Sequence, residues 1–238
     1  MLPITAKFPR KRAFVTGAAS GLGAAICEEL AQDRWTIGMC DVLEEGLADR
    51  AQRVESLGGT AIPYCFDVGD KREYKRAADK FAHDQEGIDL LVNNAGVAGA
   101  GYIGEFQLKD WEWLLQINVM GVVNGCHYFM PHFKKQRHGH VINVASIASF
   151  APVPLLSAYC TSKAAVQMFS ESLYNELQEY DVGVSVLLPD FFRTQLYERA
   201  RGEAAAQSRQ FLSNSQYSAE EVARAALDGA SKDLLHIV

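Results

Sequence analysis

Short apolar runs alternate with longer stretches of helical periodicity along the 238 residues of the chain. Apolar runs of about five to seven residues, bounded by polar residues or glycine, are typical of strands buried on both faces of a sheet. Seven such runs occur, at Arg12–Gly17, Thr36–Asp41, Ala61–Asp67, Ile88–Asn93, His140–Ala145, Val182–Leu188 and Leu234–Val238. Because helical stretches separate them, we predict βαβ units and a parallel sheet covered by helices on both faces.

The helical stretch 111–133 is apolar on every side of its middle. Its apolar positions are Leu114, Leu115, Ile117, Val119, Met120, Val122 and Val123. A helix that is apolar all round must be buried all round. One side can face the sheet, and we expect a second subunit to cover the other, with loops of the same chain as the alternative cover.

Composition agrees with one globular domain over 1–238. With 48% hydrophobic residues, a chain of this length can bury roughly 70–75% of the surface of its unfolded form. The net charge of −6, with acidic and basic residues interspersed, disfavours nucleic acid and anionic membrane as partners. The chain shows neither a signal-like apolar segment nor a membrane-length run, and its five scattered cysteines indicate reduced core residues, so we expect a cytoplasmic protein.

Three glycines stand where the first strand turns into a helix. Phe14–Thr16 is strand-like, the helical run starts at Ala24, and Gly17, Gly21 and Gly23 lie between them. The missing side chains let the backbone approach a pyrophosphate, whose charge the helix N-terminus stabilises. The turn therefore predicts a dinucleotide site.

Asp41 ends the second strand, eighteen residues after Gly23. A carboxylate at this place can accept hydrogen bonds from the adenosine ribose hydroxyls and repels a 2′-phosphate. Ser20, within the turn, is not basic. Both residues favour NAD over NADP, although Asp41 can also be read as an ordinary aspartate of a strand-end turn.

Tyr159 and Lys163 are four residues apart, so on a helix they share one face. A free tyrosine titrates near pH ~10 and is a poor base at neutrality, but a nearby ammonium stabilises the phenolate and lowers the tyrosine pKa. Ser146, after the fifth strand, can hydrogen-bond both the substrate oxygen and the tyrosine. The three residues predict acid–base catalysis of hydride transfer between an alcohol and the cofactor.

In chain order, the segments Thr16–Gly23, Asn93–Gly96 and Tyr159–Lys163, together with Ser146, resemble the short-chain dehydrogenase/reductase family. The resemblance runs from about Arg12 to the last residue. It implies a single-domain Rossmann fold with a doubly wound seven-stranded parallel sheet. It also implies an NAD-dependent enzyme that interconverts a secondary alcohol and a ketone or aldehyde.

The resemblance implies roles for individual residues. Asn118 joins Ser146, Tyr159 and Lys163 in the catalytic set, where it supports a water-linked proton relay to the lysine; the alternative is a satisfied polar residue in an apolar helix. The implied cofactor contacts are Thr16, Gly17, Ser20, Gly21, Leu22, Gly23, Asp41, Asp67, Val68, Asn94, Ala95, Gly96, Tyr159, Lys163, Pro189, Phe192 and Thr194.

The sequence departs from the family pattern at Asp190, where the family has glycine after Pro189. A buried carboxylate there would cost several kcal/mol unless it were paired or exposed. The departure affects the predicted contacts of residues 190–194.

Substrate is expected at the carboxyl ends of the fifth and sixth strands, with a substrate loop over about 190–217. The predicted substrate contacts are Ser146, Phe150, Leu156, Phe191 and Tyr197. Their apolar character favours an apolar substrate. A carboxylate or phosphate on the substrate is the alternative, because nearby basic residues can pair with it, namely Arg193, Arg199, Arg201 and Arg209.

Two other functions stay open. An NADPH-dependent carbonyl or 3-ketoacyl reductase would use the same motifs, and a non-catalytic dinucleotide sensor or scaffold would keep only the fold. We expect a homodimer or homotetramer with a small-molecule alcohol or carbonyl as substrate. We expect no metal site, because His127 and His132 do not share a helical face and no Cys/His/carboxylate cluster has ligand spacing.

Overall fold

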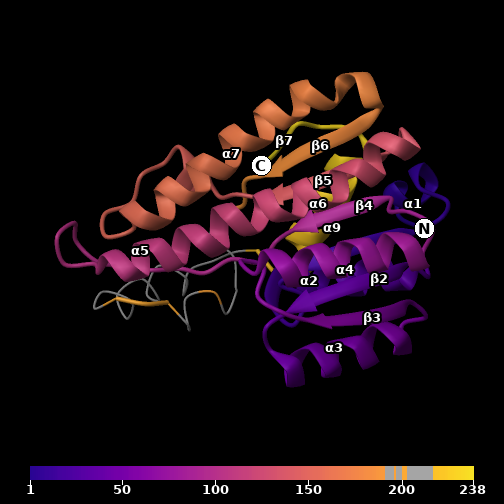
Figure 1. Ribbon diagram of the computed structural model, residues 1–238, viewed down its shortest axis with the longest axis horizontal. Coiled ribbons are helices and arrows are strands. Elements are labelled where there is room, and N and C mark those ends of the chain that lie inside the picture. The colour runs from indigo at the N-terminus through magenta and orange to yellow at the C-terminus, as the bar shows by residue number, and fades with distance from the viewer. Residues whose placement is uncertain (191–195, 197–199, 203–216) are drawn as a thin grey trace.

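The computed structural model describes residues 1–190, 196, 200–202 and 217–238, and a parallel seven-stranded sheet forms its centre (Figure 1). The strands are β1 (Arg12–Thr16), β2 (Thr36–Asp41), β3 (Thr60–Cys65), β4 (Leu90–Asn93), β5 (Gly139–Val144), β6 (Val182–Leu187) and β7 (His236–Ile237). Their order is β3-β2-β1-β4-β5-β6-β7, and each neighbouring pair is parallel. The doubly wound sheet predicted from the apolar runs is confirmed, and strand ends shift by no more than two residues.

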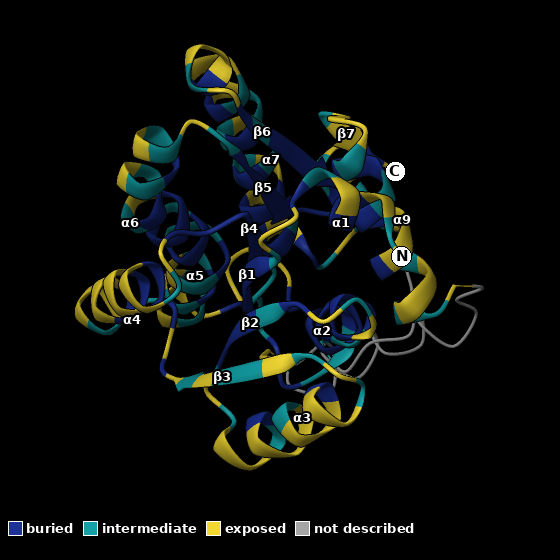
Figure 2. Ribbon diagram, turned by 90° about the vertical axis from the view of Figure 1, so that its right-hand side faces the viewer, coloured by how far each residue is buried: buried dark blue, intermediate teal, exposed yellow. Residues whose placement is uncertain are grey.

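Helices cover both faces of the sheet. They are α1 (Pro3–Lys7), α2 (Gly21–Gln32), α3 (Glu44–Ser56), α4 (Lys71–Asp84), α5 (Leu108–Leu115), α6 (Gly121–Gln136), α7 (Ser157–Leu177) and α9 (Ala219–Ser231). Figure 2 shows α4, α5 and α6 on one side of the strands and α1, α2 and α9 on the other. Each side has its own apolar core: Phe14, Phe81 and Phe129 lie in one, and Ile26, Trp35 and Leu227 in the other.

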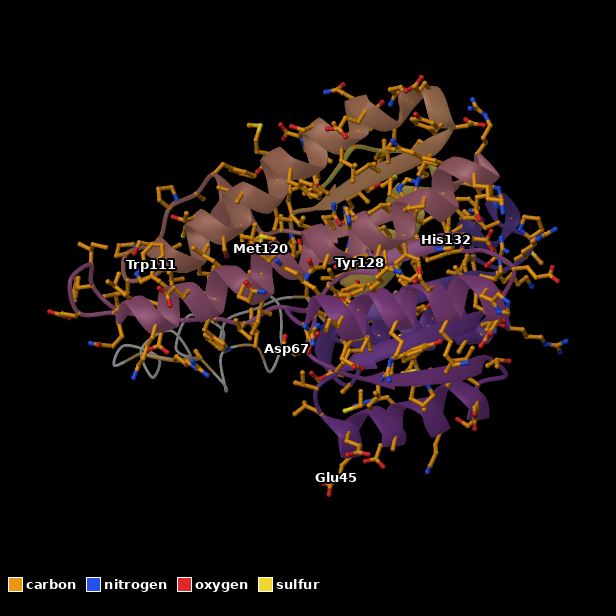
Figure 3. The ribbon with its side chains drawn as sticks, in the orientation of Figure 1. Glu45, Asp67, Trp111, Met120, Tyr128 and His132 are labelled. Atoms are coloured by element: carbon orange, nitrogen blue, oxygen red, sulfur yellow. The ribbon has the colours of Figure 1, made fainter. Side chains whose placement is uncertain are left out.

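The stretch predicted as one apolar helix over 111–133 is a column of three segments. The π-helical turn η1 (Gln116–Met120) joins α5 to α6. Leu114 and Val122 are buried, whereas Leu115, Ile117, Val119, Met120 and Val123 are only partly buried within the single chain. Figure 3 labels Trp111, Met120, Tyr128 and His132 in succession along this column, and all four are partly exposed. The chain's own residues thus leave one side of the column half covered.

One cysteine differs from the core position that the sequence predicts. Cys27, Cys40 and Cys126 are buried and Cys160 is partly buried, but Cys65 is exposed. The reason is topological: β3 is an edge strand, so its last residue has no strand on the outer side. All five thiols are free. Among the described helices, none is long and apolar enough to cross a membrane.

The parallel register places the ends of the central strands side by side. Thr16 pairs with Cys40, Asp41 with Cys65, and Asn93 with Asn143. The sheet order reverses between β1 and β4, because β2 follows β1 on one side and β4 lies on the other. Ligands bind such sheets in the crevice outside this point, so the predicted motifs meet at one edge.

Candidate active site

The glycine-rich turn packs too tightly for side chains. Gly17 and Gly21 have positive φ angles of 69° and 53°, a conformation that favours glycine. A Cβ at Gly23 would lie 2.1 Å from the Gly17 carbonyl oxygen. The turn therefore brings the N-terminus of α2, with its outward-pointing N–H groups, to the end of β1.

Thr16 fastens this turn to the segment after β4. Its hydroxyl oxygen accepts hydrogen bonds from the N–H groups of Asn94 and Ala95, both at 3.0 Å. The Asn94 side chain returns the connection by donating to the Thr16 carbonyl at 2.9 Å. Thr16 itself is buried, so its side chain holds the two motifs together beneath the predicted cofactor site.

Asp41 connects the same turn to the end of β2. Its Oδ2 accepts the Ala19 N–H at 3.0 Å, and its Oδ1 accepts the Leu43 N–H at 3.1 Å. A carboxylate has about four lone-pair sites, so both oxygens keep acceptor capacity after these bonds. Asp41 is thus oriented by the backbone and can still accept hydroxyl groups.

Asn118 lies in the π-helical turn and is fully buried. Its Oδ1 accepts the Val97 N–H at 2.8 Å, and its Nδ2 donates to the Val97 carbonyl at 2.9 Å and to Ser162 Oγ at 3.0 Å. The side chain is therefore satisfied within the protein and positions the backbone at Val97. π-helical turns occur frequently at functional sites.

Lys163 is a buried cation next to Tyr159. Both side chains belong to α7, and Lys163 Nζ lies 5.7 Å from the centre of the Tyr159 ring. Lys163 is only 4% exposed, and its ammonium donates to the Val144 carbonyl at 2.8 Å. Burial lowers the pKa of Lys163 from 10.5 to about 8. No carboxylate among the described residues forms an ion pair with it.

Ser146 lies just after β5, where it caps the short helix η2 (Ile147–Ser149). Its Oγ accepts the Ala148 N–H at 3.1 Å, and the residue is 9% exposed. A hydroxyl also carries one hydrogen to donate. The cap therefore orients Ser146 and leaves it one donor function.

A cavity of about 490 Å³ runs along this edge of the sheet. Of the predicted site residues, the structure brings to its wall Gly17, Ser20, Gly21, Leu22, Asp41, Asp67, Val68, Asn94, Ala95, Gly96, Tyr159, Lys163 and Pro189. It also brings residues that no motif indicates: Cys40, Val42, Leu43, Phe66, Val97, Trp113, Ile117, Val144, Ala145 and Leu196. For Trp113, the sequence signal is the apolar character of the stretch 111–133, which predicts a subunit contact and not a cavity wall.

Several predicted residues are not part of the cavity wall. Thr16, Gly23 and Asn118 serve the packing just described, and Ser146 lies immediately beyond the lining residue Ala145. Leu156 is buried in an apolar cluster with Tyr159, while Phe150 is 56% exposed. The predicted contacts Phe191, Phe192, Thr194 and Tyr197 lie outside the described residues, as do Arg193, Arg199 and Arg209.

The unusual Asp190 is exposed. An exposed carboxylate keeps its hydration, so the several kcal/mol that burial would cost do not arise at this position. Pro189 before it still lines the cavity. Within the described residues, no group of three or more His, Cys, Asp or Glu side chains could hold a metal ion.

The fold and these motifs define a family. The model of the short chain dehydrogenase family matches residues 11–205, and the chain belongs to this family. A probable oxidoreductase, EphD, of Mycobacterium tuberculosis is 37% identical over 183 residues, which cover 76% of this chain and 31% of the relative. The chain thus spans about a third of the length of that relative.

Two further similar proteins match this chain over more of their own length. The 3-oxoacyl-[acyl-carrier-protein] reductase FabG of Thermotoga maritima is 31% identical over 189 residues, or 79% of this chain and 77% of the relative. A short-chain dehydrogenase/reductase from Burkholderia phymatum, solved in complex with NAD, superposes with a TM-score of 0.89 at 31% identity. The superposition covers 95% of this chain and 88% of that one.

Proposed function

We propose that the chain is an NAD-dependent oxidoreductase that interconverts a secondary alcohol and the corresponding ketone. The observation that carries the proposal is the buried Lys163 ammonium beside Tyr159 at the wall of the cavity. Among the described residues no carboxylate pairs with Lys163. A purely binding protein gains nothing from such a buried cation, because burying a charge is costly. This cost disfavours the sensor or scaffold alternative.

The cavity fits a dinucleotide. Its volume of about 490 Å³ lies within the range of ~300–1,000 Å³ that small-molecule sites occupy. Gly17 and Gly21 leave the backbone open at the N-terminus of α2, where a pyrophosphate is stabilised. Asp41 would hold the adenosine ribose, and Lys163 the nicotinamide ribose. Bound NAD supplies the hydride acceptor for alcohol oxidation.

The acid–base work falls to three side chains. Tyr159 takes the alcohol proton during oxidation and returns it during reduction. The positive charge of Lys163 stabilises the phenolate that forms when Tyr159 gives up its proton. Ser146 donates its hydroxyl hydrogen to the substrate oxygen, and Asn118 keeps the backbone at Val97 in place opposite the lysine.

The charges at the cavity favour NAD over NADP. Asp41 and Asp67 contribute carboxylates to the wall near the end of β2 and β3, and Ser20 contributes no charge. Lys163 is the basic residue among the described lining residues, and it lies at the catalytic end beside Tyr159. A 2′-phosphate at Asp41 would therefore meet repulsion. The similarity to a structure in complex with NAD supports this choice.

The substrate is proposed to be apolar around its reacting carbon. Val97, Trp113 and Leu196 line the cavity with Tyr159. Arg201, one of the arginines that could recruit an acidic substrate, already pairs with Asp110 at 3.0 Å. The similarity to FabG keeps a reductase as the second candidate function.

We also propose a homodimer or homotetramer in the cytoplasm. The half-covered column of α5, η1 and α6 supports association through this face, and the free thiols are compatible with a reducing compartment. Light scattering at micromolar concentration tests the association, and a monomer of about 26.2 kDa would contradict it.

Absorbance at 340 nm tests the reaction itself. The purified protein is mixed with NAD or NADP and matched pairs of secondary alcohols, one neutral and one with a distal carboxylate. We expect turnover with NAD and the neutral alcohol. Better use of NADP would move the conclusion to the reductase, and a kcat/KM at least ten times higher for the acid would refute the apolar substrate.

Asp41→Ala is the matched variant for cofactor choice. We expect a smaller ratio of kcat/KM for NAD over NADP, because the repulsion of the 2′-phosphate and the ribose hydrogen bonds are lost together. Glu45→Ala, on the exposed side of α3 (Figure 3), is the control and should leave the ratio unchanged. An unaltered ratio in Asp41→Ala would remove Asp41 from cofactor selection.

A further inference from the structure

Residues 200–202 lie against the segment that follows β4. The Ala100 N–H donates to the Arg201 carbonyl at 2.9 Å, and the Arg201 N–H donates to the Ala98 carbonyl at 3.2 Å. These two bonds form a short parallel bridge between Gly99 and Arg201. Gly202 has a φ of 99°, and a Cβ there would lie 2.2 Å from the Ala100 carbonyl oxygen. The close approach therefore requires glycine at this position.

The Arg201 side chain continues the contact onto α5. Its guanidinium carbon lies 3.8 Å from the centre of the Trp113 ring, and its Nη1 donates to Asp110 Oδ1 at 3.0 Å. Asp110 and Trp113 are three residues apart on the helix, so they share one face. A planar guanidinium can stack on an aromatic ring and pair with a carboxylate at once, which a lysine ammonium cannot do as well.

Trp113 transmits this contact to the cavity. The indole lines the cavity together with Val97 and Leu196, and it packs against the apolar cluster that contains Tyr159. Arg201 thus stacks on a ring that also lines the cavity and packs against the cluster of Tyr159. The charge of Arg201 is paired with Asp110. Arg201 therefore affects the cavity wall through its contact with the Trp113 indole.

We propose that Arg201 is a positioning residue that holds the Trp113 indole as the wall of the substrate site, and that this wall selects neutral substrates with a bulky apolar group. The proposal rests on the proposed dehydrogenase function and adds the substrate class. It assigns selectivity to two residues that lie outside the catalytic and cofactor motifs.

A series of neutral alcohols tests the selectivity. With saturating NAD, KM and kcat are measured for 2-propanol, 2-octanol and 1-phenylethanol in the intact protein, Arg201→Ala and Arg201→Lys. In Arg201→Ala we expect KM for the two bulky alcohols to rise about tenfold, with kcat, KM for 2-propanol and KM for NAD within twofold. Arg201→Lys keeps a positive charge for Asp110, so its KM for the bulky alcohols should lie between the values of the intact protein and of Arg201→Ala. Equal KM ratios across the series, or a uniform loss in kcat, would overturn the proposal.

Two further variants isolate the ring. Trp113→Ala should lose the same preference for bulky alcohols, and adding Arg201→Ala to it should change KM no further, because the arginine acts through the indole. Lys109→Ala, an exposed basic residue of the same helix, is the matched control and should behave like the unaltered protein. Additive losses in the double variant would refute action through Trp113.

Hydrogen exchange separates this inference from the proposed function. In Arg201→Ala, amides in 98–101 and 108–115 should exchange faster, whereas Lys109→Ala should leave them unchanged. Unchanged exchange in Arg201→Ala would show that Arg201 holds nothing, even in an active enzyme. If the protein oxidises no alcohol with NAD or NADP while the exchange responds as expected, the contact stands and its role in selectivity falls with the proposed function.

Discussion

Two buried cations at opposite edges of the sheet have opposite surroundings. Arg12, at the start of β1, and Lys163, near the carboxyl ends of the strands, are each 4% exposed. Arg12 donates to both oxygens of Asp89, at 2.7 and 3.0 Å, and its Nη1 donates to the carbonyls of Gln85 and Glu86. Lys163 donates to one backbone carbonyl.

The difference separates a structural charge from a reactive one. A bidentate arginine–carboxylate pair neutralises both partners and leaves little field for other groups. A buried lysine without such a partner has a depressed pKa and is available to stabilise a charge that forms during reaction. At the amino ends of the strands, which we call the amino edge, the paired Arg12 therefore stabilises the fold. At their carboxyl ends, which we call the carboxyl edge, the buried Lys163 lowers the stability of the fold at the place of the proposed chemistry.

Removing the tyrosine hydroxyl should give the largest effect at the carboxyl edge. We expect Tyr159→Phe to reduce kcat by about 10²–10⁴, because the phenol is the proposed proton carrier. NAD affinity should stay within a few-fold. Steady-state kinetics with isothermal titration of NAD measures both. Activity above about a tenth of the unaltered enzyme would contradict the role of Tyr159.

Matched substitutions of the two cations should change stability in opposite directions. Arg12→Met removes the bidentate guanidinium partner of the buried Asp89, which keeps only the contact with His138 and the backbone N–H of residue 12. It should lower the free energy of unfolding by about 3–5 kcal/mol. Lys163→Met removes a buried charge that no described carboxylate pairs with, and it should raise the free energy of unfolding at pH 7 by about 1–3 kcal/mol, while abolishing turnover. Urea titrations measure both values.

Two observations keep this comparison testable if Arg12→Met does not fold. Arg12→Lys retains a charge but loses the bidentate geometry, so it should be destabilised by less than Arg12→Met. A Lys163→Met variant less stable than the unaltered protein at pH 7 would show that Lys163 stabilises the fold, and the contrast between the two edges would fail.

The pH dependence of the free energy of unfolding should differ between Lys163 at the carboxyl edge and Asp89 at the amino edge. These are the smallest changes that we expect. Burial lowers the folded-state pKa of Lys163 to about 8, below the unfolded value of ~10.4. Between these values the unfolded chain binds more protons, so stability rises with pH. The advantage of Lys163→Met over the unaltered protein should therefore shrink from pH 8 to about 10.4. A constant difference would contradict a titrating Lys163.

At the amino edge the dependence lies in the acid range. Burial alone would raise the pKa of Asp89, but hydrogen bonds from Arg12 and His138 hold it below the ordinary value of 3.8. Its contribution to stability is complete above the unfolded pKa and is lost as pH falls through the folded one. The difference in the free energy of unfolding between the unaltered protein and Arg12→Met should thus become smaller below pH ~4. Urea titrations at acid pH measure this difference.

The chain order of the motifs and the periodicity of its apolar runs were enough to predict the sheet, its direction and the two-sided cover of helices. They also predicted that Asp41 and the segment Asn93–Gly96 share one edge, because the carboxyl ends of parallel strands meet there. The place of Tyr159 and Lys163, which lie on a helix, was implied by the resemblance to the family. These features depend on local patterns and on a single topological rule, and both can be recognised in the residue order.

Other features depend on which distant residues pack together, and only the tertiary structure decided them. Cys65 is exposed because β3 is at the sheet edge. Trp113 lines the cavity, and Arg201, eighty-eight residues away in the chain, stacks on its ring. That no carboxylate of the described residues pairs with Lys163 likewise depends on where the other elements place their acidic side chains. Apolar periodicity indicates that a side chain is buried, but the identity of its neighbours follows from packing between elements that are far apart in sequence.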